Sequence, residues 1–217
     1  MNLRSHRSKT AAGIAGLMLV AFPLAACSSD GDDSAPERVQ AVATIENLTG
    51  DMTQIDVDPS FFETLDTLGV TPGVIEDATL DGTVLSFPIT GGNVQILPKG
   101  SVPNYVTGQI QHENSGLSLE AGGIRVELRN FNVDPTVSRV YGDVVVDGEV
   151  AATSAYLFRL DGSTLKPLQT EGDTAILEGT KVYISDVAAD LLNKTYGIKD
   201  VTDQVLVGVA KITVNTK

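Results

Sequence analysis

Two reactive residues stand out in this 217-residue chain because each is nearly alone of its kind. Cys27 is the only cysteine, and His112 is one of two histidines. The other histidine, His6, lies in a segment that we expect to be removed. A single thiol cannot form an intramolecular disulfide or the usual four-ligand zinc site of cysteines and histidines. Any Ser-His-Asp or Cys-His catalytic set would therefore have to use His112.

His112 ends a run of residues, 106–112, that we expect to form a β-strand before a turn at 113–116. Strand alternation places it on the same face as Ile110. An imidazole in this position could act as a ligand, a base or a pH sensor. The simpler interpretation is a partly buried side chain that is hydrogen-bonded to the turn. The sequence has no Gly-x-Ser-x-Gly nucleophile motif, and we assign no catalytic residue.

Carboxylates are abundant, but most of the aspartates that could pair are placed as turn residues. They precede glycine or proline at Asp58, Asp81, Asp134, Asp147 and Asp161. The aromatic floor typical of sugar subsites is also lacking, since the chain has no Trp, five Tyr and six Phe. An envelope hydrolase with paired carboxylates is the weakest alternative, and we expect no enzyme and no dedicated metal site.

The first 27 residues have the three parts of an export signal. Positive charges come first, at Arg4, Arg7 and Lys9, and an apolar run over 11–22 follows. This run is shorter than the roughly 20 residues of a membrane-spanning helix. The segment then ends in Leu-Ala-Ala-Cys, which closely resembles the lipobox of bacterial lipoproteins. That resemblance implies cleavage after residue 26 and a diacylglyceryl group on Cys27.

The charge of the chain excludes several partners. Its net charge is −13, and the three positive charges of the signal segment are the only charges before Cys27. The processed chain is therefore more acidic still, which argues against nucleic acid and against electrostatic docking on anionic lipid. Residues 27–40 combine the lipidated cysteine with an acidic, polar stretch that we expect to be a disordered tether.

Residues 41–217 make up one β-rich domain, with no linker-like stretch inside it. Short alternating or β-branched runs recur every 8–12 residues between glycine-containing turns, as in a β-sandwich or a barrel-like fold. The predicted class is all-β with two short helices. Four tyrosines fall in these runs, and we expect them to fill or cover the sheet: Tyr105, Tyr141, Tyr156 and Tyr183.

The two helices have similar boundaries. Asp58-Pro59 begins the first and Gly69 ends it, whereas Ser185 begins the second and Gly197 ends it. Each helix follows a short β-type segment and leads towards another strand. This similarity suggests a weak internal repeat, whose two units would pack at opposite edges of the sheet, each helix covering an open end.

A family resemblance covers roughly residues 54–214. The run Phe87-Pro88-Ile89-Thr90-Gly91-Gly92, followed by Gly-x-Ile-x-His at 108–112, resembles an uncharacterised domain of secreted proteins in high-GC Gram-positive bacteria. More loosely, the Gly-x-x-x-His stretch with Gly116-Leu117 after it is similar to the Htaa haem-binding domains of corynebacteria. In that family the iron ligand is a Tyr supported by a His, and only His112 is carried over here, as a cofactor-binding candidate.

We therefore expect a lipoprotein anchored to the extracytoplasmic face of the cell membrane through Cys27. The first functional hypothesis is a non-catalytic interaction or structural module with an envelope protein as partner and no resident cofactor. The alternative is capture of a small hydrophobic ligand, such as haem, with a contribution from His112. A large apolar pocket beside His112 would favour capture, whereas a filled core with a flat surface patch would favour an interaction module.

The lipid anchor can be tested with the substitution Cys27→Ala, which removes the acceptor sulfur. We expect this variant to leave the membrane fraction or to remain unprocessed, because two acyl chains are what hold such a protein stably. Membrane fractionation and intact-mass spectrometry measure both effects. A variant that stays membrane-bound with a lipid-modified mass would contradict the lipobox prediction.

Overall fold

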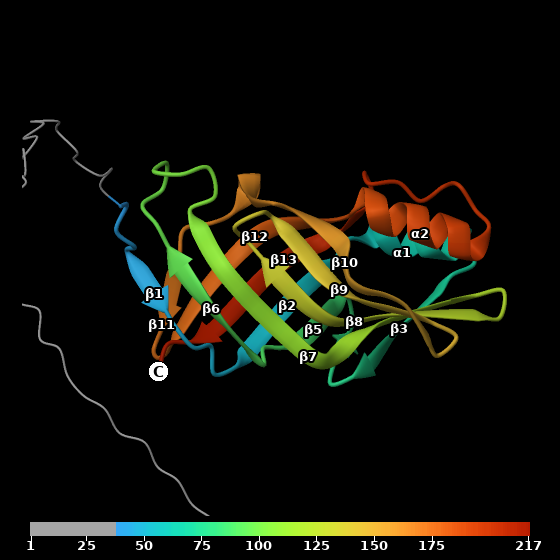
Figure 1. The fold of residues 1–217 in the computed structure, drawn as a ribbon, viewed down its shortest axis with the longest axis horizontal. Helices are drawn as coiled ribbons and strands as arrows, with labels where there is room; N and C mark the ends of the chain where they lie inside the picture. Colours follow the sequence, from blue (N-terminus) through green and yellow to red (C-terminus); the bar gives the residue numbers. More distant parts are fainter. Residues whose placement is uncertain (1–37) are drawn as a thin grey trace, which may run out of the picture. The chain divides into compact units, whose positions relative to one another are not determined.

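The structure is a computed structural model that describes residues 38–217. It consists of one antiparallel sheet of 13 strands, curled into a half-barrel, with two short helices at one end (Figure 1). This confirms the predicted all-β class with two short helices. The strands are β1 (Ala43–Ile45), β2 (Asp51–Val57), β3 (Thr71–Glu76), β4 (Thr79–Asp81), β5 (Val84–Pro88), β6 (Gly91–Ile96), β7 (Val106–Ala121), β8 (Ile124–Asp134), β9 (Arg139–Val146), β10 (Glu149–Asp161), β11 (Gln169–Glu171), β12 (Thr174–Ile184) and β13 (Leu206–Asn215).

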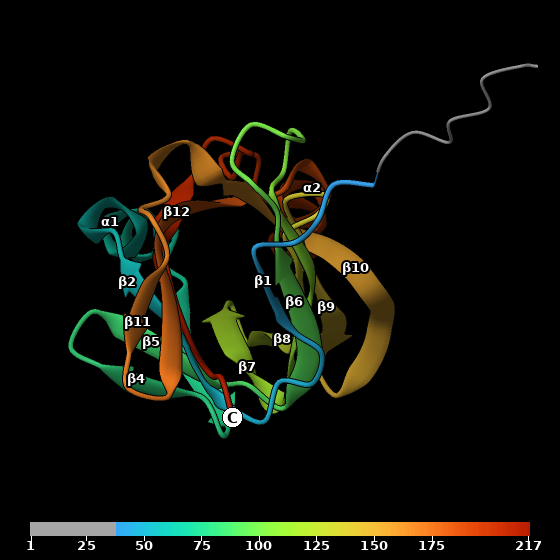
Figure 2. The ribbon, with the colours of Figure 1, turned by 90° about the vertical axis from the view of Figure 1, so that its left-hand side faces the viewer.

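The strand order along the sheet is β1-β6-β7-β8-β9-β10-β12-β13-β2-β5-β4, with β11 paired to β12 and β3 paired to β7. Figure 2 looks along the curl from the end opposite the helices. Alternation along the strands decides which side chains face inward. In β8, for example, Val126 and Leu128 are buried, whereas Glu127 between them is only partly buried and pairs with two arginines outside.

The two helices, α1 (Pro59–Thr67) and α2 (Asp186–Tyr196), begin at the predicted caps. The Asp58 carboxylate accepts from the backbone N–H of Ser60 at 2.9 Å, and the Ser185 hydroxyl accepts from that of Ala188 at 2.9 Å. Both helices turn apolar residues towards the sheet and lie at the same end of the half-barrel (Figure 1). They close that end, and the Tyr196 hydroxyl ties α2 to the carbonyl of Leu119 at 2.7 Å.

The predicted arrangement of the two helical units at opposite edges is wrong. The strands that precede the helices, β2 and β12, both pair with β13, so the units lie side by side within the sheet. The reason is that β13 pairs with β12 along one of its edges and with β2 along the other. Neither unit covers an outer edge of the sheet.

The turn predicted at 113–116 is also wrong, because β7 runs through it as one strand of 16 residues with an irregularity between His112 and Gly116. Asn114 adopts a left-handed backbone with φ +54°, which asparagine tolerates. A Cβ atom on Gly116 would lie 2.2 Å from the carbonyl oxygen of Leu128, so only glycine allows this close approach. His112 therefore lies within a long strand and not at a strand end.

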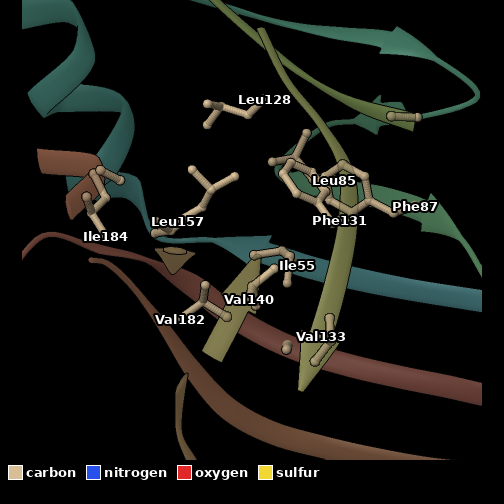
Figure 3. Packing of buried hydrophobic residues seen from close by; sticks show 14 of the residues in the cluster. Ile55, Leu85, Phe87, Leu128, Phe131, Val133, Val140, Leu157, Val182 and Ile184 are labelled. Atoms are coloured by element: carbon tan, nitrogen blue, oxygen red, sulfur yellow. The ribbon is translucent and has the colours of Figure 1, made fainter. Parts of the chain in front are cut away.

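A layer of aromatic and aliphatic side chains packs in the middle of the half-barrel (Figure 3). The ring of Phe131 meets that of Phe87 edge to face, with centroids 5.3 Å apart, and that of Phe158 at 5.9 Å. Leu157 is fully buried beside this layer. The layer separates the end that the helices close from the opposite end.

The substitution Leu157→Ala tests the importance of this layer. Removing a fully buried leucine side chain leaves a cavity, and we expect the free energy of unfolding to fall by about 2–5 kcal/mol. Urea unfolding followed by circular dichroism measures it. Val150→Ala is the matched control, because Val150 lies on the same strand with 64 % of its surface exposed, and its effect should stay within about 0.5 kcal/mol. Equal effects of the two substitutions would contradict this packing.

Candidate functional site

A cavity of about 540 Å³ occupies the half-barrel between the packed layer and the end opposite the helices. Its wall is mainly aliphatic and aromatic, and its members include Ile55, Phe87, Val106, Ile110, Phe131, Val133, Val140, Phe158, Leu177, Val182 and Ile212. Around its outer end lie residues 103–105 before β7, Pro135 and Ser138 between β8 and β9, and the short 3₁₀ helix η1 (Gly162–Thr164). This volume lies within the range of about 300–1,000 Å³ that is typical of small-molecule sites.

His112 lies in the wall of this cavity with 1 % of its surface exposed. Its Nδ1 is 3.2 Å from the carbonyl oxygen of Phe131, and its Nε2 is 2.7 Å from Oγ1 of Thr53. A carbonyl oxygen can only accept, so Nδ1 carries the proton and donates to Phe131. Nε2 is then an acceptor, and the Thr53 hydroxyl donates to it.

Burial sets the charge state of His112. Loss of solvation lowers the pKa of its imidazole to about 4, which outweighs the hydrogen bond to the Phe131 carbonyl that acts in the opposite direction. The ring is therefore neutral at pH 7. The edge of its neighbour Phe87 approaches at a centroid distance of 6.5 Å, so the surroundings are apolar.

This geometry matches the way proteins prepare an imidazole as a ligand. A histidine that binds a metal usually donates its second ring N–H to a carbonyl or carboxylate, which fixes the tautomer and leaves the other nitrogen free to coordinate. In His112 the Phe131 carbonyl takes the first role, and Nε2 holds the available lone pair. Thr53 occupies that lone pair, so a ligand that coordinates Nε2 would have to displace the hydroxyl.

Thr53 is the site residue that the sequence analysis missed. It lies on β2, which is not a sheet neighbour of β7, so the hydrogen bond joins two separate walls of the half-barrel. The sequence pattern around Thr53 could have indicated its role. Thr53, Ile55 and Val57 alternate as buried positions, and a hydroxyl in such a row needs a partner.

The other residues singled out from the sequence have different positions. Tyr105 lines the cavity near its outer end, whereas Tyr141, Tyr156 and Tyr183 lie on strands β9, β10 and β12 without lining it. The structure does not bring these three tyrosines to His112. Cys27, the signal segment and most of the tether lie outside the residues that the structure describes.

Within residues 38–217, no three His, Cys, Asp or Glu side chains gather in a way that could hold a metal ion. The same part of the chain contains no helix with the length and apolar character needed to cross a membrane.

Comparison with known proteins yields relatives by structure alone. No protein-family model matches the sequence, and no curated protein matches it. The C-terminal domain of HtaA from Corynebacterium glutamicum is similar over 78 % of this chain and 98 % of its own length, with 14 % identity and a TM-score of 0.55. The heme binding protein HtaB from the same organism gives 10 % identity, 80 % and 96 % coverage, and a TM-score of 0.48. The likeness to HtaA shows a shared fold.

The neutral state of His112 predicts a dependence of stability on pH. Because its pKa is lower in the folded state than in the unfolded chain, its contribution is fully present above about pH 6.5 and is lost as the pH falls towards 4. We expect a loss of ~3 kcal/mol from this group across that window. Urea unfolding at pH 7 and pH 4.5 measures it, with His112→Gln as the variant that cannot titrate. If both proteins lose the same stability, the imidazole is not buried as described.

Proposed function

We propose that this protein captures a small, largely apolar molecule inside the half-barrel, at the extracytoplasmic face of the membrane to which Cys27 anchors it. The observation that carries this proposal is the apolar cavity of about 540 Å³ with His112 in its wall. Of the two sequence hypotheses, capture is the one that requires such a cavity. Capture needs no catalytic residue, and the anchor would keep the captured molecule at the cell surface.

The energetics of the cavity support this proposal. In other proteins, a rigid empty cavity costs about 24 cal/mol per Å³. At that rate a closed cavity of this size would cost on the order of 10 kcal/mol, which is an upper bound for a space that is open at one end. Water entering from the open end lowers this figure but leaves apolar walls wet. A ligand that fills the space removes much of the cost, so the fold gains stability when the ligand binds.

Haem is the first ligand to test, because the His112 segment resembles Htaa domains and the fold is shared with HtaA. A haem iron takes an axial ligand from the protein, and a neutral imidazole is one of the usual choices. In the Htaa family a Tyr is the ligand and a His supports it, but His112 is the residue carried over here and it lies in the cavity wall. His112 would therefore provide the ligand itself, through Nε2, after the Thr53 hydroxyl has turned away. The apolar walls would contact the faces and edges of the macrocycle. An apolar ligand without a metal would instead use the Thr53–His112 pair as its polar contact.

Two substitutions on β13 test the location of binding. Ala210 faces the cavity, whereas its neighbour Val209 does not line it and has 37 % of its surface exposed. We expect Ala210→Phe to fill the cavity and weaken ligand binding at least about tenfold, while Val209→Phe leaves binding unchanged. Absorbance titration with haemin and a thermal-shift screen of lipids measure binding. Equal affinities of the two variants would place the ligand outside the half-barrel.

The same titrations assign the role of His112. Loss of the haem absorbance spectrum in His112→Ala, with the thermal shift by lipids retained, would make the imidazole an iron ligand. If the protein binds neither haemin nor any lipid of the screen, the capture proposal is wrong. The envelope interaction module is then the favoured hypothesis.

A further inference from the structure

The outer face of strands β9, β10 and β12 presents two arginines whose guanidinium groups lie over tyrosine rings outside the cavity. Arg139 on β9 and Arg159 on β10 are directly opposite each other in the strand register. Val140 and Phe158, their neighbours in sequence, line the cavity, so alternation directs both arginine side chains outward. Arg159 also contributes to the cavity wall, but its guanidinium group lies over the ring of Tyr183, which does not line the cavity. Arg139 is exposed and Arg159 is partly exposed.

Three tyrosines share this face with the arginines. Tyr141 is paired with Tyr156 across β9 and β10, with ring centroids 6.1 Å apart, and Tyr183 on β12 is opposite Arg159. The guanidinium carbon of Arg139 lies 4.5 Å from the centre of the Tyr156 ring, and that of Arg159 lies 4.4 Å from the centre of the Tyr183 ring. Each guanidinium group is therefore held over an aromatic face, which restricts its motion.

The charges on this face are unbalanced. Like charges directly opposite on neighbouring strands destabilise a sheet. The sequence has 28 acidic and 15 basic residues, so carboxylates are plentiful. Yet among the described residues none forms an ion pair with Arg139 or Arg159, although Arg125 and Arg129 on β8 both pair with glutamates. Two carboxylates act on the arginines without forming an ion pair with them: Asp186 at the start of α2 acts on Arg139, and Asp161, two residues along β10, acts on Arg159.

We infer that this face is an anion site that takes a phosphate group between Arg139 and Arg159. Two fixed guanidinium groups offer up to ten N–H donors and two positive charges. A phosphate group matches them with a charge near −2 and three or four acceptor oxygens, and arginine binds it through paired N–H···O bonds. A single carboxylate has half the charge and two oxygens. The acidic surface of the rest of the chain disfavours a long polyanion, so a small phosphate or phosphate ester is the expected ligand.

Tyrosine fluorescence provides a direct test, because the chain has no Trp and three of its five tyrosines lie at this site. We expect inorganic phosphate and glycerol 3-phosphate, titrated separately into the purified protein, to change the fluorescence to saturation. Arg139→Gln and Arg159→Gln should each weaken binding about tenfold, and Arg159→Lys, which keeps the charge but loses the planar group, should weaken it less. Arg125→Gln is the matched control and should bind as the unaltered protein does.

The outcomes separate the alternatives. Binding of inorganic phosphate alone identifies the ligand as free phosphate, and binding of both identifies a phosphate ester. The proposal is overturned if sodium chloride of equal ionic strength produces the same change, if acetate binds as well as phosphate, or if the two Gln variants respond like the control. In those cases the arginines only cover the tyrosine rings.

Discussion

The structure depends on keeping a curled sheet hollow, and the hydrogen bond between Thr53 and His112 is a buried side-chain contact that joins two of its walls. β2 and β7 have no backbone pairing with each other, so this side-chain bond connects strands that lie far apart in the sheet order. Because both partners are buried, losing one of them leaves an unsatisfied polar group at a cost of about 1–3 kcal/mol. The hydrogen bond from Nδ1 to the Phe131 carbonyl sets the tautomer of the same imidazole, so His112 takes part both in the support of the walls and in the chemistry of the cavity.

The two ends of the half-barrel differ because both α-helices lie at the same end. α1 and α2 pack apolar faces over one end, and the aromatic layer of Phe87, Phe131 and Phe158 closes the interior behind them. The other end is surrounded by the loops before β7 and between β8 and β9 and by η1, which line the rim of the cavity. The cavity is therefore not a packing defect spread through the core. It is a defined space between a filled layer and an open end, where a ligand can enter without unfolding the sheet.

Because side chains alternate along the strands, the two faces of the sheet have different chemical character. On β9 and β10, Val140 and Phe158 face the cavity, while the guanidinium groups of Arg139 and Arg159 lie outside it over tyrosine rings. A small apolar ligand inside and a phosphate group outside would therefore contact opposite faces of the same strands.

The sequence alone was sufficient for local features, because these depend on neighbours along the chain. The caps at Asp58 and Ser185 and the glycines that end the helices are read from adjacent residues, and alternation predicted the β-rich class. Contacts between distant residues were decided only by the tertiary structure. The close approach of Gly116 to Leu128 turned a predicted turn into a continuous β7, and β13 placed the two helical units side by side. The pairing of Thr53 with His112, 59 residues apart, depends on the curl of the whole sheet, and no local pattern encodes that curl.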